Sequence, residues 1–99
     1  MKKRFTYHIY ILTNKGNTVF YIGVTNNIVK RIFEHKTGFI EGFTQKYSVH
    51  DLLYYEIYED PENAILREKQ IKGWSRKKKE NLIIEFNPGQ RDLYEEIIR

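Results

Sequence analysis

The chain has 99 residues, of which 40% are hydrophobic and 30% are charged, and its formal net charge is +4. This length predicts one globular domain over residues 1–99, built around one modest core. The absence of cysteine excludes disulfides and thiolate metal sites. Because no stretch is long and apolar enough to span a membrane or to act as a signal peptide, we expect a cytoplasmic protein.

The charges are distributed unevenly along the chain. Residues 1–50 contain eight Lys and Arg against two Asp and Glu, whereas residues 51–99 contain nine against eleven. Residues 67–79 alone hold seven basic side chains and one acid. Either a phosphate-binding surface or an ordinary solvated helix face explains this basic cluster, and the pattern alone leaves both open.

The first predicted element is a β-hairpin with strands over residues 5–13 and 18–24, which are rich in Tyr, Ile, Phe, Thr and Val. A two-residue turn at residues 15–16 would place Tyr10 directly opposite Tyr21. Side-chain alternation then puts an apolar stripe on the other face, which we expect to face the core: Ile9, Ile11, Phe20 and Ile22. Two phenols on the face away from that stripe indicate a site.

A helix over residues 28–36 follows, with N-cap candidates at residues 25–27 and a C-cap at Gly38. Arg31 and His35 fall together on this helix, one turn apart and beside its apolar stripe. The stripe is predicted to consist of Ile28, Val29, Ile32 and Phe33.

Residues 37–50 contain two glycines and scattered aromatic residues, and are predicted to form a loop with at most a short turn of helix. A third strand is predicted over residues 52–58. Strict alternation divides its side chains between the two faces of the sheet, with Leu53, Tyr55 and Ile57 on one and Leu52, Tyr54, Glu56 and Tyr58 on the other.

Three helices complete the predicted fold. Asp60-Pro61 is a typical helix start, and this helix is expected to run to Lys72. Ser75 caps the next helix, which runs to about Phe86. A short last helix over residues 92–98 docks through Leu93, Tyr94, Ile97 and Ile98. The predicted order is β β α β α α with a helical tail, an α+β fold in which helices flank a three-stranded sheet.

Glu68 projects from the face of its helix that is expected to meet the sheet, because it lies four residues after Ala64 and three before Ile71. A buried carboxylate needs a cation, strong hydrogen bonds or a metal ion. From its position alone, Glu68 forms either a buried salt bridge with Arg31 or Arg67, or part of a functional site.

Two tripeptides, His8-Ile9-Tyr10 and Tyr21-Ile22-Gly23, resemble those that give the GIY-YIG nuclease family its name. The match continues through Arg31, His35 and Glu68 in the same order. Further along, three segments are similar to small stand-alone bacterial members that are described as predicted endonucleases: residues 67–74, 87–88 and 91–94. The resemblance covers nearly the whole chain.

This resemblance implies hydrolysis of phosphodiester bonds in DNA or a related nucleic acid, with one divalent metal ion, Mg²⁺ or Mn²⁺. Glu68 would hold the ion. Arg31 would bind the phosphate and offset charge in the transition state. Tyr21 would act as the base, supported by a hydrogen bond with Tyr10. Because a phenol has a pKa of about 10, a cation must help it, and His35 or the metal ion would supply that charge.

Two positions depart from the family pattern. His8 replaces the first glycine, where it either covers part of the site or adds a phosphate contact. Val24 stands where the repair-nuclease branch has a lysine that helps to deprotonate a tyrosine, so that proton path cannot operate unchanged. The remaining motif residues, Ile9, Ile22 and Gly23, are assigned structural roles.

Five basic side chains are predicted to contact the nucleic-acid backbone: Lys30, Lys36, Arg76, Lys77 and Lys78. Trp74 is interpreted as a core residue rather than a stacking platform. Phe39, Phe43 and Tyr47 either stack on unpaired bases or anchor their loop. The histidines show no zinc-site spacing.

The predicted function is therefore a metal-dependent endonuclease whose partner is nucleic acid and not a membrane. One alternative is a nucleic-acid-binding module of the same fold that cleaves slowly or not at all. A second alternative is an adaptor that binds another protein through residues 92–98.

Overall fold

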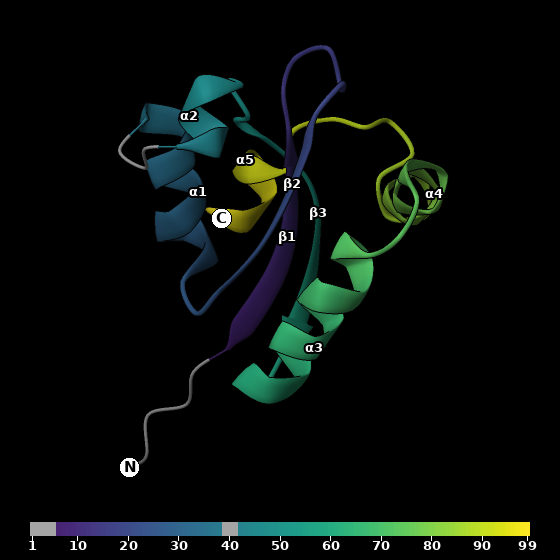
Figure 1. Ribbon diagram of the computed structural model, residues 1–99. Helices are drawn as coiled ribbons and strands as arrows, with labels where there is room; N and C mark the ends of the chain where they lie inside the picture. The colour runs from purple at the N-terminus through teal and green to yellow at the C-terminus, as the bar shows by residue number, and fades with distance from the viewer. Residues whose placement is uncertain (1–5, 39–41) are drawn as a thin grey trace.

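The computed structural model describes residues 6–38 and 42–99 (Figure 1). Its elements confirm the predicted α+β order: β1 (Tyr7–Thr13), β2 (Phe20–Thr25), α1 (Ile28–Thr37), α2 (Phe43–Lys46), β3 (Asp51–Tyr58), α3 (Pro61–Lys72), α4 (Arg76–Phe86) and α5 (Tyr94–Ile97). The predicted strand start at Phe5 and the loop residue Phe39 lie outside the described residues, as does the side chain of Phe43. Within the described part of the chain, no helix combines the length and apolarity that a membrane crossing requires.

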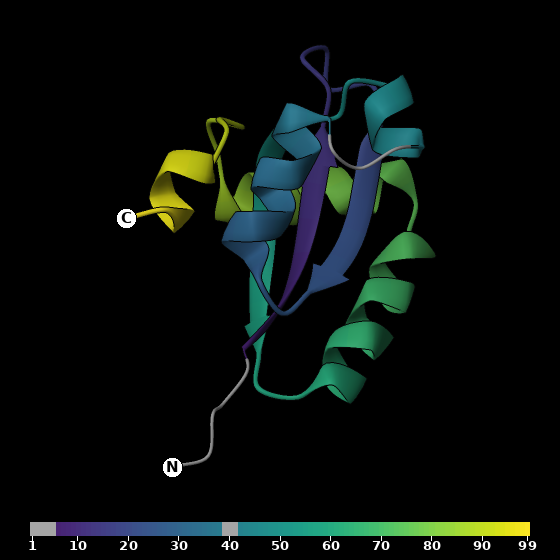
Figure 2. The same ribbon diagram turned by 90° about the vertical axis from the view of Figure 1, so that its left-hand side faces the viewer.

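The three strands form one antiparallel sheet in the order β2-β1-β3, so that β1 is central and β2 and β3 are its edges. Figures 1 and 2 show that α1, α2 and α5 lie on one side of this sheet, and α3 and α4 on the other. Because helices cover both faces, side chains from both faces of the central strand are buried.

Each face of the sheet carries its own hydrophobic cluster. The cluster under α3 and α4 confirms the predicted apolar stripe and contains Ile9, Ile11, Ile22, Leu53, Tyr54, Ile71 and Ile83. The cluster under α1 and α5 contains Tyr10, Leu12, Ile28, Ile32, Val49, Leu52 and Leu93. The expectation of one core with an open tyrosine face is therefore wrong: the face that carries Tyr10 is a second core, and this side chain is only 1% exposed.

The hairpin register differs from the predicted one by two residues. Tyr10 lies opposite Gly23, and Tyr21 lies opposite Leu12. The connection spans residues 14–19 because the Asn14 side-chain oxygen accepts two backbone N–H bonds across the loop, at 2.9 and 3.3 Å, which stabilises a wider turn. A shift of two residues preserves the face of every side chain, so both phenols still project on the same side.

Strand β3 breaks the predicted alternation near its start. Ile11 pairs with Tyr54 but Leu12 pairs with Leu52, which leaves Leu53 as an extra residue in a bulge. Leu53 and Tyr54 therefore both enter the cluster under α3 and α4. The bulge lets this short segment supply apolar side chains to both faces of the sheet.

The helix boundaries confirm the predicted capping signals. The side chains of Asn27, Asp60 and Ser75 accept backbone N–H bonds at the starts of α1, α3 and α4. Gly38 ends α1 in the left-handed conformation, with φ 76°. The predicted short turn of helix in the third connection is also present, as α2.

The inward face of α1 differs from the predicted stripe. Ile28 and Ile32 are buried, but Val29 and Phe33 are 38% and 48% exposed, and His35 takes the third inward position. Helical geometry allows either face to turn inward. His35 decides between them because both its ring nitrogens find hydroxyl partners in the interior.

The chain end forms a single helical turn, shorter than the predicted helix over residues 92–98. The Asp92 carboxylate accepts the N–H groups of Leu52, at 3.0 Å, and Tyr94, at 3.1 Å, so that it ties the tail to β3 and starts the turn. Leu93 is buried as predicted, whereas Ile98 is 45% exposed and does not dock.

Candidate active site

The side chains predicted to be catalytic come from four elements, β1, β2, α1 and α3, and α1 and α3 lie on opposite sides of the sheet (Figures 1 and 2). Their electrostatic effects on Tyr10 indicate how close they lie. Burial raises the pKa of Tyr10 above its ordinary value of 10, and charges on Tyr21 and Glu68 raise it further, whereas Arg31 lowers it. The fold thus brings together residues that are up to 58 positions apart in the sequence.

Tyr10 and His35 form the buried base of this site. The Tyr10 hydroxyl is hydrogen-bonded to His35 Nε2 at 3.2 Å, and His35 Nδ1 is hydrogen-bonded to the Thr44 hydroxyl at 3.0 Å. The Tyr21 ring completes an aromatic cluster, with its centroid 6.3 Å from that of Tyr10 and 5.4 Å from that of His35. Thr44 was not predicted, because nothing in the local sequence indicates that α2 folds over the histidine.

His35 is neutral near pH 7. Burial, and then the positive charge of Arg31, lower the pKa of His35 to about 4 from its ordinary value of 6.5, although Glu34 acts in the opposite direction. Of the two predicted sources of positive charge for a phenolate, His35 and the metal ion, this pKa shift favours the metal ion. The role of His35 in this geometry is to hold the Tyr10 hydroxyl by a hydrogen bond.

We expect the free energy of unfolding to fall as pH decreases from 6.5 to about 4, because the unfolded chain then takes up a proton that folded His35 excludes. Above this window His35 is neutral in both states and contributes no pH dependence. Between pH 7 and pH 5, His35 is expected to lower the free energy of unfolding by about 2 kcal/mol.

Denaturant titrations of the wild type and His35→Gln at both pH values measure this contribution. The variant should lose less stability on acidification, because it lacks the group that titrates. Equal losses in the two proteins would contradict the assignment.

Arg31 and Glu68 each form an ion pair within their own helix. Arg31 is 45% exposed and lies 3.5 Å from Glu34, and Glu68 is 14% exposed and lies 3.4 Å from Lys72. Of the two alternatives for Glu68, the buried salt bridge with Arg31 or Arg67 does not form among the described residues, where Glu68 pairs with Lys72. Pairs within one helix contribute only about 0.3–0.5 kcal/mol, so a phosphate or a cation can replace either partner.

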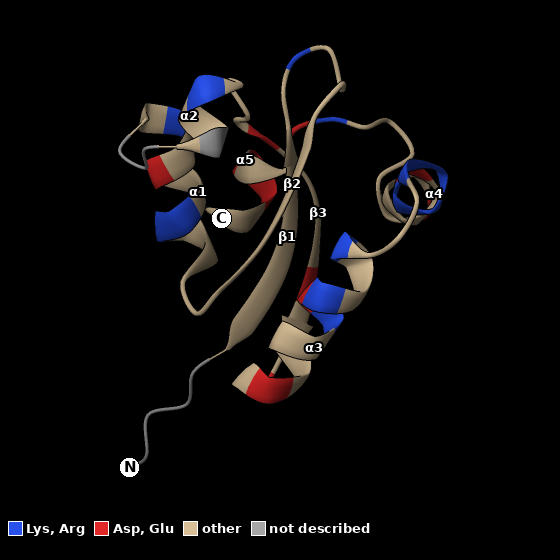
Figure 3. Ribbon diagram, in the orientation of Figure 1, with Lys and Arg blue, Asp and Glu red and all other residues tan. Residues whose placement is uncertain are grey.

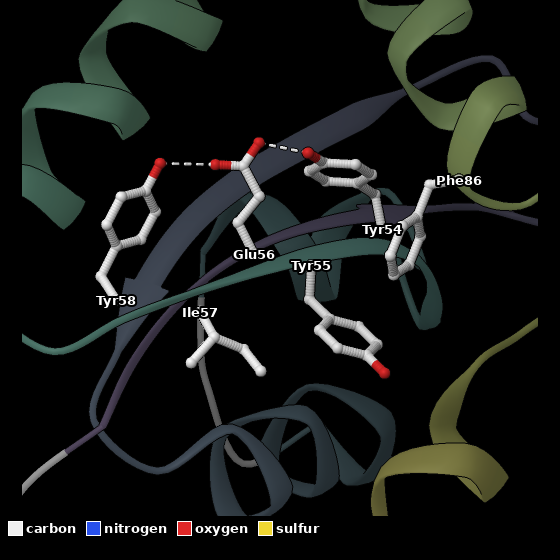
Figure 4. Close-up of a pocket in the computed structure, with 6 residues that line it drawn as sticks. All are labelled: Tyr54, Tyr55, Glu56, Ile57, Tyr58 and Phe86. Atoms are coloured by element: carbon white, nitrogen blue, oxygen red, sulfur yellow. Dashed lines mark hydrogen bonds between the residues drawn. The ribbon is translucent and has the colours of Figure 1, made fainter.

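Arg67 pairs instead with Glu56 on β3, at 3.1 Å. Figure 4 shows Glu56 between Tyr54 and Tyr58, whose hydroxyls both donate to its carboxylate. This network borders a pocket of about 490 Å³ at the β3 edge. Because β3 is the edge opposite β2, the pocket is separate from the candidate site, and its carboxylate is already satisfied.

The residues present fit a magnesium-type ion only in part. Among residues 6–38 and 42–99, no group of three or more His, Cys, Asp or Glu side chains could hold a metal. A single carboxylate, Glu68, is nevertheless compatible with Mg²⁺, which proteins often bind through one or two carboxylates, with waters and substrate phosphates as the other ligands. Any such ion would therefore depend on bound nucleic acid for part of its coordination.

Gly23 has a steric role that the register explains. A Cβ atom at this position would lie 2.4 Å from Cζ and from the hydroxyl oxygen of Tyr10. The missing side chain is therefore what allows the Tyr10 ring to lie across β2 toward His35. Ile9 and Ile22, the other motif residues, are buried in the opposite cluster.

His8 lies on the central strand β1, where it pairs with Thr25 of β2 and Ile57 of β3. Its ring centroid is 6.1 Å from that of Tyr55 on β3, and burial lowers its pKa. No hydrogen-bond partner of His8 Nδ1 occurs in the described part of the chain. Of the two interpretations of His8, these contacts favour packing over a phosphate contact.

Figure 3 shows basic segments on α1, α3 and α4, which lie on both sides of the sheet. Two of the predicted phosphate contacts have internal partners. Lys36 pairs with Asp92, and the Arg76 guanidinium donates to the carbonyls of Thr18 and Asn17. These two residues attach the tail and α4 to the rest of the fold.

The other basic candidates remain closer to solvent. Lys30 and Lys77 are exposed, and Lys78 places its ammonium 4.3 Å from the Trp74 ring centroid. Trp74 packs against the cluster under α3 and α4, as predicted for a core residue. Tyr47 is 42% exposed and has the Lys46 ammonium 5.4 Å from its ring centroid.

The sequence and geometry together define a GIY-YIG protein. The family model described as the GIY-YIG catalytic domain matches residues 6–81, which is more than half of the chain. The protein therefore belongs to this family, whose fold is a nuclease fold, and the resemblance stated from its motifs is confirmed.

Similar proteins carry the name UPF0213. The chain is 35% identical over 79 residues to a UPF0213 protein of Staphylococcus saprophyticus, and the matched region covers 80% of this chain and 95% of the relative. It is 37% identical over 76 residues to a UPF0213 protein of Clostridium perfringens, and the matched region covers 77% of this chain and 81% of the relative. The solution NMR structure of a UPF0213 protein from Bacillus halodurans matches with a TM-score of 0.51 and 29% identity, over 79% of this chain and 82% of that one.

Proposed function

We propose that the protein is an endonuclease that hydrolyses phosphodiester bonds of DNA or a related nucleic acid with one Mg²⁺ or Mn²⁺ ion. The observation that carries this proposal is that the charges of Tyr21, Arg31 and Glu68 all act on the buried Tyr10, which is hydrogen-bonded to His35. Membership of the GIY-YIG family supports the same reaction class.

Each residue has a distinct role in this proposal. Arg31 binds the scissile phosphate with its planar set of donors and offsets the charge that develops in the transition state. Tyr21, which is half-buried rather than fully buried, orients or deprotonates the attacking water. Tyr10 is too buried for that task and instead supports the Tyr21 ring, while His35 fixes the Tyr10 hydroxyl.

Glu68 is the proposed metal ligand. A bound divalent ion would stabilise negative charge on the leaving 3′ oxygen. Because His35 is neutral, the positive charge that favours a Tyr21 phenolate must come from Arg31 or from that ion.

Lys30, Lys77 and Lys78 are the proposed backbone contacts that remain closest to solvent. They act through sequence-independent attraction to phosphates, so binding should weaken as salt rises. Lys36 and Arg76 can add to this electrostatic attraction while they keep their contacts within the protein.

Replacement of Arg31 by alanine tests the proposed reaction. We expect Arg31→Ala to lower the rate of metal-dependent nicking by about a hundredfold, because one charged donor to the phosphate is lost. Lys46→Ala removes an exposed cation on α2 and should stay within about twofold of the wild type. Labelled duplex, branched and single-stranded substrates are incubated with Mg²⁺, Mn²⁺ or EDTA.

The wild-type result separates the candidate functions. Nicking with Mg²⁺ or Mn²⁺ that stops in EDTA supports the enzyme. Binding without nicking would leave the non-cleaving module of the same fold. The adaptor alternative has less support, because Leu93, Tyr94 and Ile97 of the tail pack into the cluster under α1 and are not presented to a partner.

A further inference from the structure

A pocket of about 280 Å³ adjoins the proposed active site where β2 ends and α1 and α3 begin. Its walls include Tyr7, Val24, Asn26, Arg31 and Ile65. The elements that form it are far apart in the sequence, so the pocket exists only in the folded chain. The catalytic roles proposed above leave this pocket without a function.

The pocket is connected with the proposed catalytic residues through Arg31 and through α3. Arg31 belongs to both, since it lines the pocket and is the proposed phosphate ligand. Ile65 precedes Glu68 by three residues, so the two side chains lie on the same face of α3, about one turn apart. A nucleotide whose phosphate is bound at Arg31 would therefore have its own or a neighbouring base within reach of the pocket.

The chemistry of the walls suits the two kinds of surface that a nucleobase presents. Val24, Ile65 and the Tyr7 ring offer apolar and aromatic surface for the flat faces of a base. Asn26, which is exposed, offers an amide for its polar edge. Pockets for drug-sized ligands start at about 300 Å³, so this volume suits a single base.

A base inside a duplex cannot enter such a pocket without leaving its stack. Extruding a paired base costs a few kcal/mol, and the cost is least for a base that is already unpaired. A pocket beside the scissile phosphate would therefore favour nucleic acids that contain an unpaired nucleotide at that position.

We infer that the pocket formed by Tyr7, Val24, Asn26, Arg31 and Ile65 holds an unstacked nucleobase next to the scissile phosphate. The preferred substrate class is then a nucleic acid with an unpaired nucleotide, such as a bulge or a flap. This inference rests on the proposed function for the position of the phosphate, but it concerns binding and is measured without cleavage.

The test compares the affinity of the wild type for two labelled DNA duplexes in EDTA, one with a single-nucleotide bulge and one fully paired. The extra nucleotide is 2-aminopurine, whose fluorescence reports stacking. We expect the bulged duplex to bind about tenfold more tightly, with quenched fluorescence, because base–aromatic stacking is gained only there.

Two variants address the pocket directly. Val24→Phe fills it, and Asn26→Ala removes the edge contact from an exposed position where folding should be unaffected. Both should bring the affinity ratio of the two duplexes toward one while leaving the affinity for the paired duplex unchanged. Ile57→Phe is the matched control, because it enlarges an apolar side chain that is 61% exposed on the opposite edge strand.

The outcomes distinguish this inference from the proposed function. A preference for the bulge that Val24→Phe and Asn26→Ala both abolish supports the pocket, even if no metal-dependent nicking occurs. Equal binding of the two duplexes by the wild type overturns the inference, even if both are nicked. A preference that survives in both variants also overturns it, because the base must then bind elsewhere.

Discussion

Glu68→Gln is expected to lower the rate of metal-dependent nicking by about a thousandfold, because it removes the carboxylate charge that the proposed site offers to a divalent ion. The substitution keeps the size of the side chain, which is only 14% exposed, and gives up one ion pair within a helix, with Lys72. Since such pairs contribute about 0.3–0.5 kcal/mol, the folded state should persist. Initial rates over a range of Mg²⁺ and Mn²⁺ concentrations measure the effect.

Glu62→Gln is the matched control, because it makes the same chemical change on an exposed position of the same helix. It should retain the wild-type rate to within about twofold. Retention of full activity by Glu68→Gln would show that the metal ligand has been misassigned. Loss of folding, read from the far-ultraviolet circular dichroism of both variants, would show instead that Glu68 has a structural role.

Gly23→Ala is expected to lower the free energy of unfolding by about 1–3 kcal/mol, the usual cost of overpacking a buried site. The new methyl group would lie 2.4 Å from Cζ and from the hydroxyl oxygen of Tyr10, a side chain that is only 1% exposed. The ring must move, and its hydrogen bond with His35 at 3.2 Å should weaken. Denaturant titration measures the loss.

Gly16→Ala provides the control for the substitution itself. A Cβ atom there would meet its nearest neighbour, the Thr18 methyl group, at 3.6 Å, which is ordinary van der Waals contact. Its stability should therefore stay within about 1 kcal/mol of the wild type. Equal losses in the two variants would contradict the close approach of Tyr10 to Gly23.

Features that depend on neighbouring residues were predictable from the sequence. The caps Asn27, Asp60 and Ser75 act on backbone groups three positions away, so the start of each helix could be inferred from the local pattern. Side-chain alternation correctly placed Tyr10 and Tyr21 on one face, because that assignment survives a register shift of two residues.

Features that depend on which of several possible contacts forms were not predictable from the sequence. The Asn14 hydrogen bonds widened the hairpin loop, and this changed the partner of Tyr10 from Tyr21 to Gly23. The partner of Glu68 could not be predicted either. A carboxylate on this helix can pair with a basic side chain of the same helix, as Glu68 does with Lys72, or with one across the sheet.

The sequence by itself determined the order of strands and helices, their capping and the motif residues that identify the family, because these follow from local backbone preferences and side-chain type. Only the tertiary structure decided the pKa shifts of His35 and Tyr10. Burial of His35 beneath α2 lowers its pKa to about 4 and makes it neutral, and burial of Tyr10 raises the pKa of that phenol. Desolvation depends on which segments cover a side chain, and here those segments lie far away in the sequence.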